Sequence, residues 1–106
     1  MKYDEGKADM SLIPPGAMED ISRVFMFGAE KYGRYNWRMD GSKTEFSRTY
    51  ASVQRHLNAY WAGEDEDPES GLSHLAHAMT QLIILMTHAS DGHSHMDDRY
   101  IEEDME

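Results

Sequence analysis

The chain contains 106 residues, with 10 Lys and Arg side chains against 20 Asp and Glu side chains, and a formal net charge of -10. This length is typical of one small domain. The acidic balance argues against duplex nucleic acid as a partner, because phosphate neutralisation needs a basic surface. The absence of cysteine excludes disulfides, zinc ribbons and thiol catalysis. No apolar run approaches the ~20 residues of a membrane span and no signal peptide is visible, so we expect a soluble, cytoplasmic protein with no membrane partner.

Acidic side chains concentrate at the C-terminus, where residues 91–106 hold seven Asp or Glu side chains and one Arg. Such a composition is typical of a solvated segment without firm packing. We therefore expect residues 1–90 to form a single all-α domain and residues 91–106 to form an acidic, mobile C-terminal tail. Because a chain of about 90 residues has a small core, association with a second copy would help it to bury apolar surface.

Three segments show the apolar spacing of amphipathic helices, over residues 16–32, 44–62 and 70–89. Ser42 and Glu45 have the spacing of a capping box at the start of the second segment. The third segment is apolar around much of its circumference, as a central helix would be. The sequence therefore predicts an all-α fold, a small antiparallel helical bundle of three main helices that is completed by oligomerisation.

Apolar stripes on the first and third segments are expected to face the core. The stripe of the first segment comprises Met18, Ile21, Phe25, Gly28 and Tyr32. The stripe of the third segment comprises Leu72, Leu75, Met79, Leu82, Ile83 and Met86.

The connector between the first two helices carries two large rings, Tyr35 and Trp37, in a stretch rich in Gly, Asn, Asp and Ser. Because rings of this size are unfavourable in water, we expect both to anchor the connector on the core. Asn36 and Trp37 are alternatively suited to a nucleobase, since Trp offers a stacking face and Asn offers both a hydrogen-bond donor and an acceptor.

His74 and His77 are three residues apart in the third helix and therefore point in similar directions. In an antiparallel hairpin, the end of the second helix brings His56 near this pair. The connector acids expected nearby are Glu64, Asp65 and Asp67. Mixed imidazole and carboxylate shells suit Mn²⁺, Fe²⁺, Co²⁺ or Zn²⁺, whereas Mg²⁺ prefers oxygen. The alternative is that each histidine is packed in the core or at an interface and paired with a carboxylate.

Basic side chains are scarce, and five of them lie near these features. Lys31 is near the end of the first helix, and Arg34 and Arg38 are in the connector. Arg48 and Arg55 lie seven residues apart on one face of the second helix, and Arg55 adjoins His56. A phosphate-bearing ligand would use several such groups, Arg through bidentate contacts and Lys through a point charge. The alternative is that each is a surface cation paired with an acid.

Several sequence blocks follow one another in a distinctive order over residues 2–86. They are Lys2-x-Asp4-x-Gly6-Lys7, Leu12-Ile13-Pro14-Pro15, Phe27-Gly28-Ala29-Glu30-Lys31-Tyr32-Gly33 with Asn36-Trp37, Arg55-His56-Leu57, Gly63-Glu64-Asp65-x-Asp67-Pro68-Glu69-Ser70-Gly71, and His74-Leu75-Ala76-His77-Ala78. In these blocks the chain resembles the phage-associated dATP/dGTP diphosphohydrolase family, in its N-terminal domain. That family is similar to the MazG-like all-α nucleoside triphosphate pyrophosphatases.

The resemblance implies a metal-dependent (deoxy)purine nucleoside triphosphate pyrophosphohydrolase. Enzymes of the MazG-like kind are helical dimers or higher oligomers that use Mg²⁺ or Mn²⁺ to cut the α–β bond and release pyrophosphate. The implied partners are a purine (deoxy)nucleotide and further copies of the chain, in the host cytoplasm if a phage encodes it. MazG-like enzymes carry Glu-x-x-Glu on one helix and Glu-x-x-Asp on the next, whereas this chain has Arg55-His56 and His74-x-x-His77 at those places.

The resemblance also assigns expected roles to the candidate residues. Glu64 or Asp65 would be catalytic, accepting the proton of the attacking water, and Lys31 and Arg55 would stabilise charge on the phosphates. The expected metal ligands are His56, Glu64, Asp67, His74 and His77. The expected substrate-binding residues are Lys31, Asn36, Trp37, Arg38 and Arg55.

Two other functions remain compatible with the sequence. The missing glutamate pairs favour a nucleotide-binding phage protein, a sponge or sensor that does not hydrolyse its ligand. A purely structural helical oligomer would instead pack its histidines inertly. An acidic connector repels a triphosphate unless a cation is bound. A metal-dependent pyrophosphohydrolase of this kind is therefore expected to lose nucleotide binding when a chelator removes the metal.

Overall fold

A computed structural model describes residues 5–39, 44–92 and 94–100 of the chain. Within these ranges the α-helices are α1 (Pro15–Tyr32), α2 (Phe46–Trp61) and α3 (His74–Ser90). Short 3-10 turns are η2 (Met10–Leu12), η3 (Asn36–Arg38) and η5 (Ser94–Met96). The described residues contain no β-strand, only one isolated bridge between Glu66 and Ser73. The predicted all-α class and the three predicted helices are therefore confirmed.

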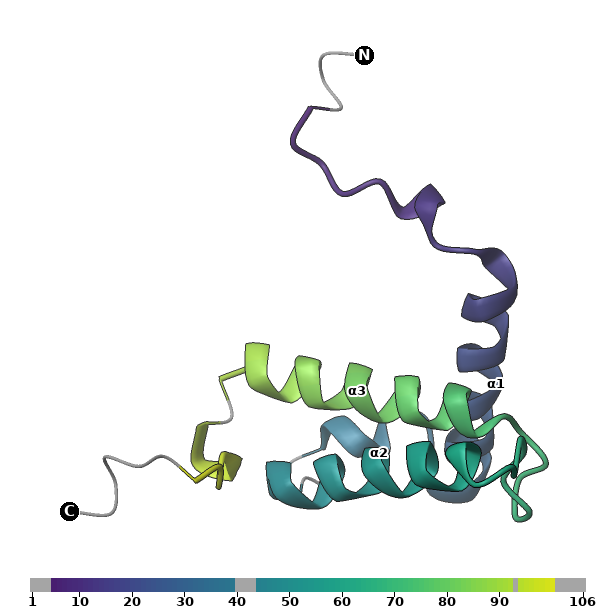
Figure 1. The fold of residues 1–106 in the computed structure, drawn as a ribbon. Helices are drawn as coiled ribbons and strands as arrows, with labels where there is room; N and C mark the ends of the chain where they lie inside the picture. Colours follow the sequence, from purple (N-terminus) through teal and green to yellow (C-terminus); the bar gives the residue numbers. More distant parts are fainter. Residues whose placement is uncertain (1–4, 40–43, 93, 101–106) are drawn as a thin grey trace.

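The helices α2 and α3 run antiparallel, and α3 packs against both α2 and α1 (Figure 1). Helix α1 crosses the hairpin at the end where the connector between α2 and α3 turns. The described N-terminal residues 5–14 extend away from the helices, and all of them are exposed. None of the described helices combines the length and apolar character that a membrane span requires.

The last residues of the connector between α2 and α3 form a hydrogen-bonded turn and not the first turn of α3. Gly71 has a φ of 71°, and the Asp67 N–H donates to the Leu72 carbonyl oxygen at 2.8 Å. The Ser73 hydroxyl then caps α3 by accepting from two backbone N–H groups of its first turn. Helix α3 therefore begins at His74, later than the predicted residue 70, because the preceding residues form the turn and the cap.

The start of α2 is stabilised by a residue from the far end of the chain. The predicted capping box is wrong, because Glu45 occupies the N-cap position itself and makes no side-chain cap bond; Ser42 lies outside the described residues. The Asp98 carboxylate instead accepts from the Ser47 N–H at 2.9 Å and from the Ser47 hydroxyl. A carboxylate at this point satisfies an unpaired N–H group and complements the helix dipole.

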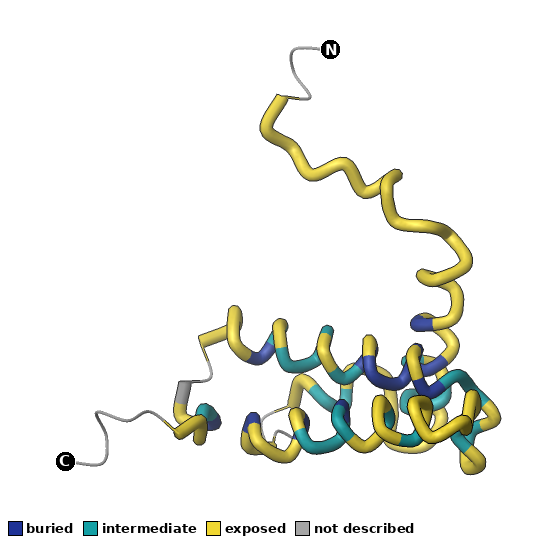
Figure 2. Tube along the Cα trace, viewed as in Figure 1, coloured by how far each residue is buried: buried dark blue, intermediate teal, exposed yellow. Residues whose placement is uncertain are grey.

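The buried residues gather where α3 meets its two neighbours (Figure 2). Among the described residues no large side chain is less than 2% exposed, so the single chain has only a thin core. The expected stripe of α1 is wrong at both ends, since Met18 and Tyr32 are 47% and 64% exposed. The reason is that, among the described helices, α1 packs mainly on α3 and only over part of its length.

The expected stripe of α3 is also largely uncovered. Four of its members are 38% to 70% exposed: Leu75, Met79, Leu82 and Met86. Their spacing of four, three and four residues places them on one face. His77, Gln81, Ile84 and His88 have the same spacing on the opposite face and line a cavity. Helix α3 therefore separates a cavity face from an exposed apolar face.

Candidate functional site

Two histidines meet where the end of α2 lies beside the start of α3. His56 belongs to the second half of α2, and His74 is the first residue of α3. Their Nδ1 atoms are 2.8 Å apart, and their ring centroids are 5.1 Å apart. A contact of this length between two ring nitrogens requires one of them to donate a proton and the other to offer its lone pair.

Glu64 orients the ring of His74. Its Oε1 atom lies 2.6 Å from His74 Nε2. Because a carboxylate accepts hydrogen bonds, Nε2 carries the proton, and Nδ1 of a neutral His74 ring then presents its lone pair toward His56. Asp65 reaches the same histidine through its backbone, since its carbonyl oxygen accepts from the His74 N–H at 2.9 Å. The Asp65 side chain is exposed.

His77 joins His56 and His74, and we call these three residues the histidine cluster. Its ring stacks on His56 at a centroid distance of 4.6 Å and an interplanar angle of 7°. The Ser70 Oγ atom lies 2.7 Å from His77 Nε2 and accepts from the Leu72 N–H at 3.1 Å, which leaves its own proton to be donated to the imidazole. The Ser70 N–H donates to Asp67 Oδ2 at 3.1 Å. One serine of the connector thus holds both His77 and Asp67.

His56, Asp67 and His74 fit a divalent metal ion. Each offers one ligand atom, and these atoms all lie within 4.8 Å of one another. Two nitrogens bound to one tetrahedral ion at about 2.1 Å would be about 3.4 Å apart, so the 2.8 Å between the Nδ1 atoms needs to widen only slightly. Two imidazoles and one carboxylate suit Zn²⁺, Mn²⁺, Fe²⁺ or Co²⁺ better than Mg²⁺.

The local electrostatics favour the cation-binding forms of these side chains. Burial lowers the pKa of His77 and of His56 below 6.5, and neighbouring imidazoles lower the pKa of His56 further. Burial opposes ionisation of Asp67, but the Ser70 N–H and the nearby His77 outweigh it and hold the pKa of this carboxyl below 3.8. At neutral pH the imidazoles of His56 and His77 are therefore unprotonated and the Asp67 carboxylate is charged, the forms that bind a metal ion.

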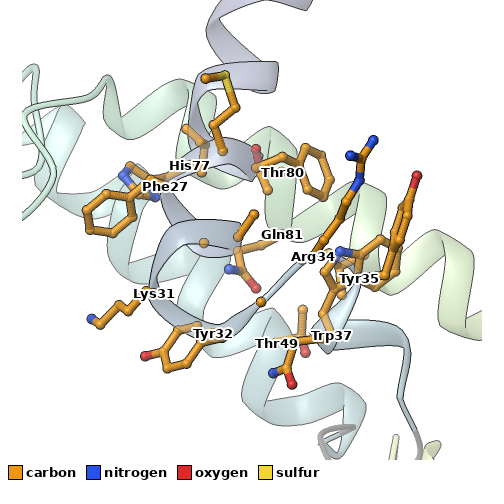
Figure 3. Close-up of a pocket in the computed structure, with 18 of the residues that line it drawn as sticks. Phe27, Lys31, Tyr32, Arg34, Tyr35, Trp37, Thr49, His77, Thr80 and Gln81 are labelled. Carbon is orange, nitrogen blue, oxygen red and sulfur yellow. The ribbon is translucent and has the colours of Figure 1, made fainter.

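A cavity of about 1130 Å³ lies beside the histidine cluster (Figure 3). Residues of α1, its following connector, α2 and α3 line it. His77 belongs to both features, because it lines the cavity and stacks on His56. Lys31 lines the same side of the cavity as His77, and its ammonium lies 2.5 Å from the Glu69 carboxylate. This side of the cavity therefore combines imidazole and ammonium groups.

Aromatic rings line both sides of the cavity: Phe27 and Tyr32 lie beside Lys31 and His77, and further rings lie on the other side (Figure 3). Trp37 lies 6.0 Å from Phe25 and 5.8 Å from His88 between ring centroids, which confirms that Trp37 anchors the connector. The same prediction is wrong for Tyr35, which is 58% exposed. Tyr35 adopts a left-handed conformation with a φ of 60°, and its ring lies beneath the Arg34 guanidinium rather than against the core.

The structure gathers some of the expected substrate-binding residues and not others. Lys31, Asn36 and Trp37 all line the cavity. Arg38 pairs with Asp91 at 2.9 Å and is not among the described lining residues. Arg55 is exposed on α2 and likewise does not line the cavity, although its charge helps to lower the pKa of His56.

Three further polar residues line the cavity: Arg34, Thr80 and Gln81. Gln81 lies one helical turn after His77 and continues the stripe of His74 and His77 along α3. Thr80 gives no such signal, because a threonine in a helix usually bonds its own backbone. Arg34 follows Gly33, and only the folded connector shows that it reaches the cavity.

Comparison with known proteins identifies the family to which the chain belongs. Residues 1–99 match the family model described as dATP/dGTP diphosphohydrolase, N-terminal. The chain belongs to this family. The match includes all the described residues of the histidine cluster and of the cavity, and it confirms the resemblance in the sequence blocks.

One relative of the family adds an activity name. The protein named dATP/dGTP diphosphohydrolase of Salmonella phage PMBT28 is 42% identical over 85 residues, a stretch that covers 80% of this chain. The same stretch covers 28% of the relative, so the chain spans less than a third of that protein's length. No solved structure matches the chain.

Proposed function

We propose that this chain binds a purine deoxynucleoside triphosphate in the cavity and, with a divalent ion at the histidine cluster, hydrolyses it to the monophosphate and pyrophosphate. The support for the substrate class is the family and the name of the phage relative. The structural observation that carries the proposal is the position of His77. His77 lines the cavity and stacks on His56 of the histidine cluster. A ligand bound in the cavity would therefore lie next to the candidate metal ligands.

In the proposed mechanism the nucleotide lies with its phosphates toward His77 and its base toward Trp37. His56, Asp67 and His74 would hold the ion, which supplies charge neutralisation at the phosphates and activation of water. Lys31 would attract the phosphate tail from the same side of the cavity. Its present partner Glu69 lies at the exposed surface, where exchanging one carboxylate for a phosphate costs little.

Glu64 has two roles open to it in this mechanism. It already accepts from His74 Nε2 and so positions a candidate metal ligand. It is also a half-exposed carboxylate beside the cluster, and a carboxylate at this place can accept a proton from an attacking water as general base. We keep Asp65 as the second candidate base, because its exposed side chain follows Glu64 in the connector.

Incubation of the purified protein with dATP or dGTP and Mn²⁺, followed by identification of the products, tests the proposal. Equal amounts of nucleoside monophosphate and pyrophosphate, over many turnovers and abolished by EDTA, would support it. The variant His74→Phe should lose this activity, whereas His95→Gln, at an exposed residue outside the cluster, should retain it. Binding that is equally tight with and without EDTA would contradict a metal-dependent site.

Nucleotide binding without hydrolysis is the second candidate. The observation that favours it is the absence of paired glutamates from α2, which contributes His56 to the cluster and has the exposed Arg55 beside it in sequence. A chain of this kind would show saturable nucleotide binding, and no pyrophosphate would accumulate beyond one equivalent.

We also propose that a second copy of the chain covers the exposed face of α3. This face carries Leu75, Met79, Leu82 and Met86 at the spacing of a helix-packing seam. Leu82→Glu should shift the protein to a lower mass in sedimentation, whereas Arg48→Glu on the polar surface of α2 should not. A wild-type monomer at micromolar concentration would contradict this interface.

A further inference from the structure

Thr80 carries a buried hydroxyl that its own helix does not satisfy. The residue is 3% exposed, and its Oγ1 atom has no hydrogen-bond partner among the described residues. Thr87, in the same helix, behaves in the ordinary way, because its Oγ1 donates to the Ile83 carbonyl oxygen at 2.8 Å. The geometry of α3 therefore permits the usual back-bond, and the Thr80 side chain does not make it.

The Thr80 side chain lines the cavity beside Gln81 (Figure 3). Thr80 is three residues beyond His77 and eight residues before His88, which correspond to about 4.5 Å and about 12 Å along the helix axis. It therefore lies past the histidine cluster, toward the rings of Trp37 and Phe25. The unsatisfied hydroxyl is a polar group in a cavity whose lining also contains apolar side chains, among them Val24 and, one helical turn further along α3, Ile84.

These surroundings suit a nucleobase rather than a phosphate. Moving a phosphate into an apolar wall without a cation is strongly unfavourable, and Lys31 and the histidine cluster lie at the other side. The desolvation of an aromatic base against apolar side chains costs little free energy, and the base can stack on a ring such as Trp37. Its edge then needs a few polar partners, and Thr80 and Gln81 are adjacent residues that can both donate and accept.

We propose that the Thr80 hydroxyl hydrogen-bonds the substituent at position 6 of a purine base and so lets one cavity accept both adenine and guanine. The inference rests on the proposed function. A hydroxyl can rotate to accept from the 6-amino group of adenine or to donate to the 6-oxo group of guanine. A side chain that only donates or only accepts would select one of the two bases, so the chemistry of threonine matches a site that takes both.

Calorimetry on the full chain with Mn²⁺ tests the assignment. The ligands are dATP, dGTP and purine deoxyriboside triphosphate, which has hydrogen at position 6, each as the non-hydrolysable α,β-methylene analogue. Thr80→Val removes the hydroxyl and keeps the shape of the side chain. It should weaken binding of dATP and dGTP about tenfold and leave binding of the unsubstituted purine unchanged. The matched control Thr87→Val, outside the cavity lining, should change none of the three affinities.

Two further measurements separate this role from a structural one. Thr80→Ser keeps the hydroxyl and should keep both affinities, while Thr80→Val should fold at least as stably as the wild type because it loses no hydrogen bond. Equal weakening of all three ligands, or of none, would overturn the contact with position 6. A wild-type chain that binds no nucleotide would overturn the proposed function itself and this inference with it.

Discussion

His56 and His74 belong to different helices, yet their Nδ1 atoms lie 2.8 Å apart. The arrangement depends on the hairpin: α2 ends and α3 begins beside each other, and the folded connector between them places Asp67 at the same point. His77 closes the cluster from one helical turn further along α3 by stacking on His56. The proposed metal site depends on this arrangement, in which the ligand atoms of His56, Asp67 and His74 lie within 4.8 Å of one another.

His56→Phe is expected to weaken binding of Mn²⁺ or Zn²⁺ at least about 100-fold, because it removes a ligand nitrogen. Phenylalanine retains a ring that can stack on His77, so the packing is largely preserved. Titration calorimetry of the metal alone measures the effect. Asn58→Ala, at an exposed position of the same helix, is the control and should bind as the wild type does. Equal metal affinity in His56→Phe would remove His56 from the site.

Glu64→Gln is expected to weaken metal binding by about 10- to 100-fold, as for other outer partners of ligand histidines. The amide can still accept a hydrogen bond, but it lacks the charge that makes His74 a stronger ligand. Glu69→Gln is the matched control, since Glu69 is an exposed acid of the same connector and pairs with Lys31. If both variants lowered the affinity equally, the general negative charge of the connector would be responsible, and the specific contact would not.

The sequence was sufficient to predict the three helices and the meeting of the histidines with Asp67. Helical periodicity and the length of the acidic connector determine an antiparallel hairpin, and the hairpin determines which residues meet at its closed end. The start of α3 was misplaced because Ser73 caps the helix after a turn whose hydrogen bonds join residues 67 and 72. Local spacing does not reveal such a turn.

The cavity residues were harder to predict because they depend on the angle at which α1 crosses the hairpin. That angle brings Trp37 against Phe25 and His88 and leaves Tyr35 exposed, although the two rings lie in one short connector. It also selects Arg34 over Arg38 as the arginine that lines the cavity. Trp37 and Tyr35, and likewise Arg34 and Arg38, look alike in the sequence, and only the tertiary packing decides which ring anchors the connector and which arginine lines the cavity.

The fold is expected to lose stability as the pH falls below the usual histidine pKa. Burial lowers the pKa of His77 and of His56 below 6.5 in the folded chain, so the unfolded chain binds more protons in the acidic range. Stability is therefore fully present above about pH 6.5 and decreases as the pH falls toward and through the lowered folded values. Thermal melts in EDTA at pH 7.5, 6.5 and 5.5 measure this slope. His77→Gln should make it shallower, and an unchanged slope in that variant would contradict the assignment.

Substitutions at Gly28 can test the stability of α1 and the occupancy of the cavity separately. Gly28 lies within α1 and lines the cavity, and a Cβ atom added there would meet nothing within 4 Å. Gly28→Ala should therefore stabilise the protein by about 0.5–1 kcal/mol, because alanine is the better helix former. Denaturant unfolding measures this change, and a loss of stability would show that the backbone at this position needs glycine.

A larger side chain at the same position should block the cavity without touching the histidine cluster. Gly28→Leu is expected to weaken nucleotide binding at least about tenfold, since its side chain would occupy space that the base needs, while metal affinity stays at the wild-type value. Binding can be followed by the fluorescence of Trp37 in a Trp61→Phe background, because the chain has only these two tryptophans. Undiminished nucleotide affinity in Gly28→Leu would place the nucleotide outside this cavity, and equal loss of metal and nucleotide affinity would show a wider disturbance of the fold.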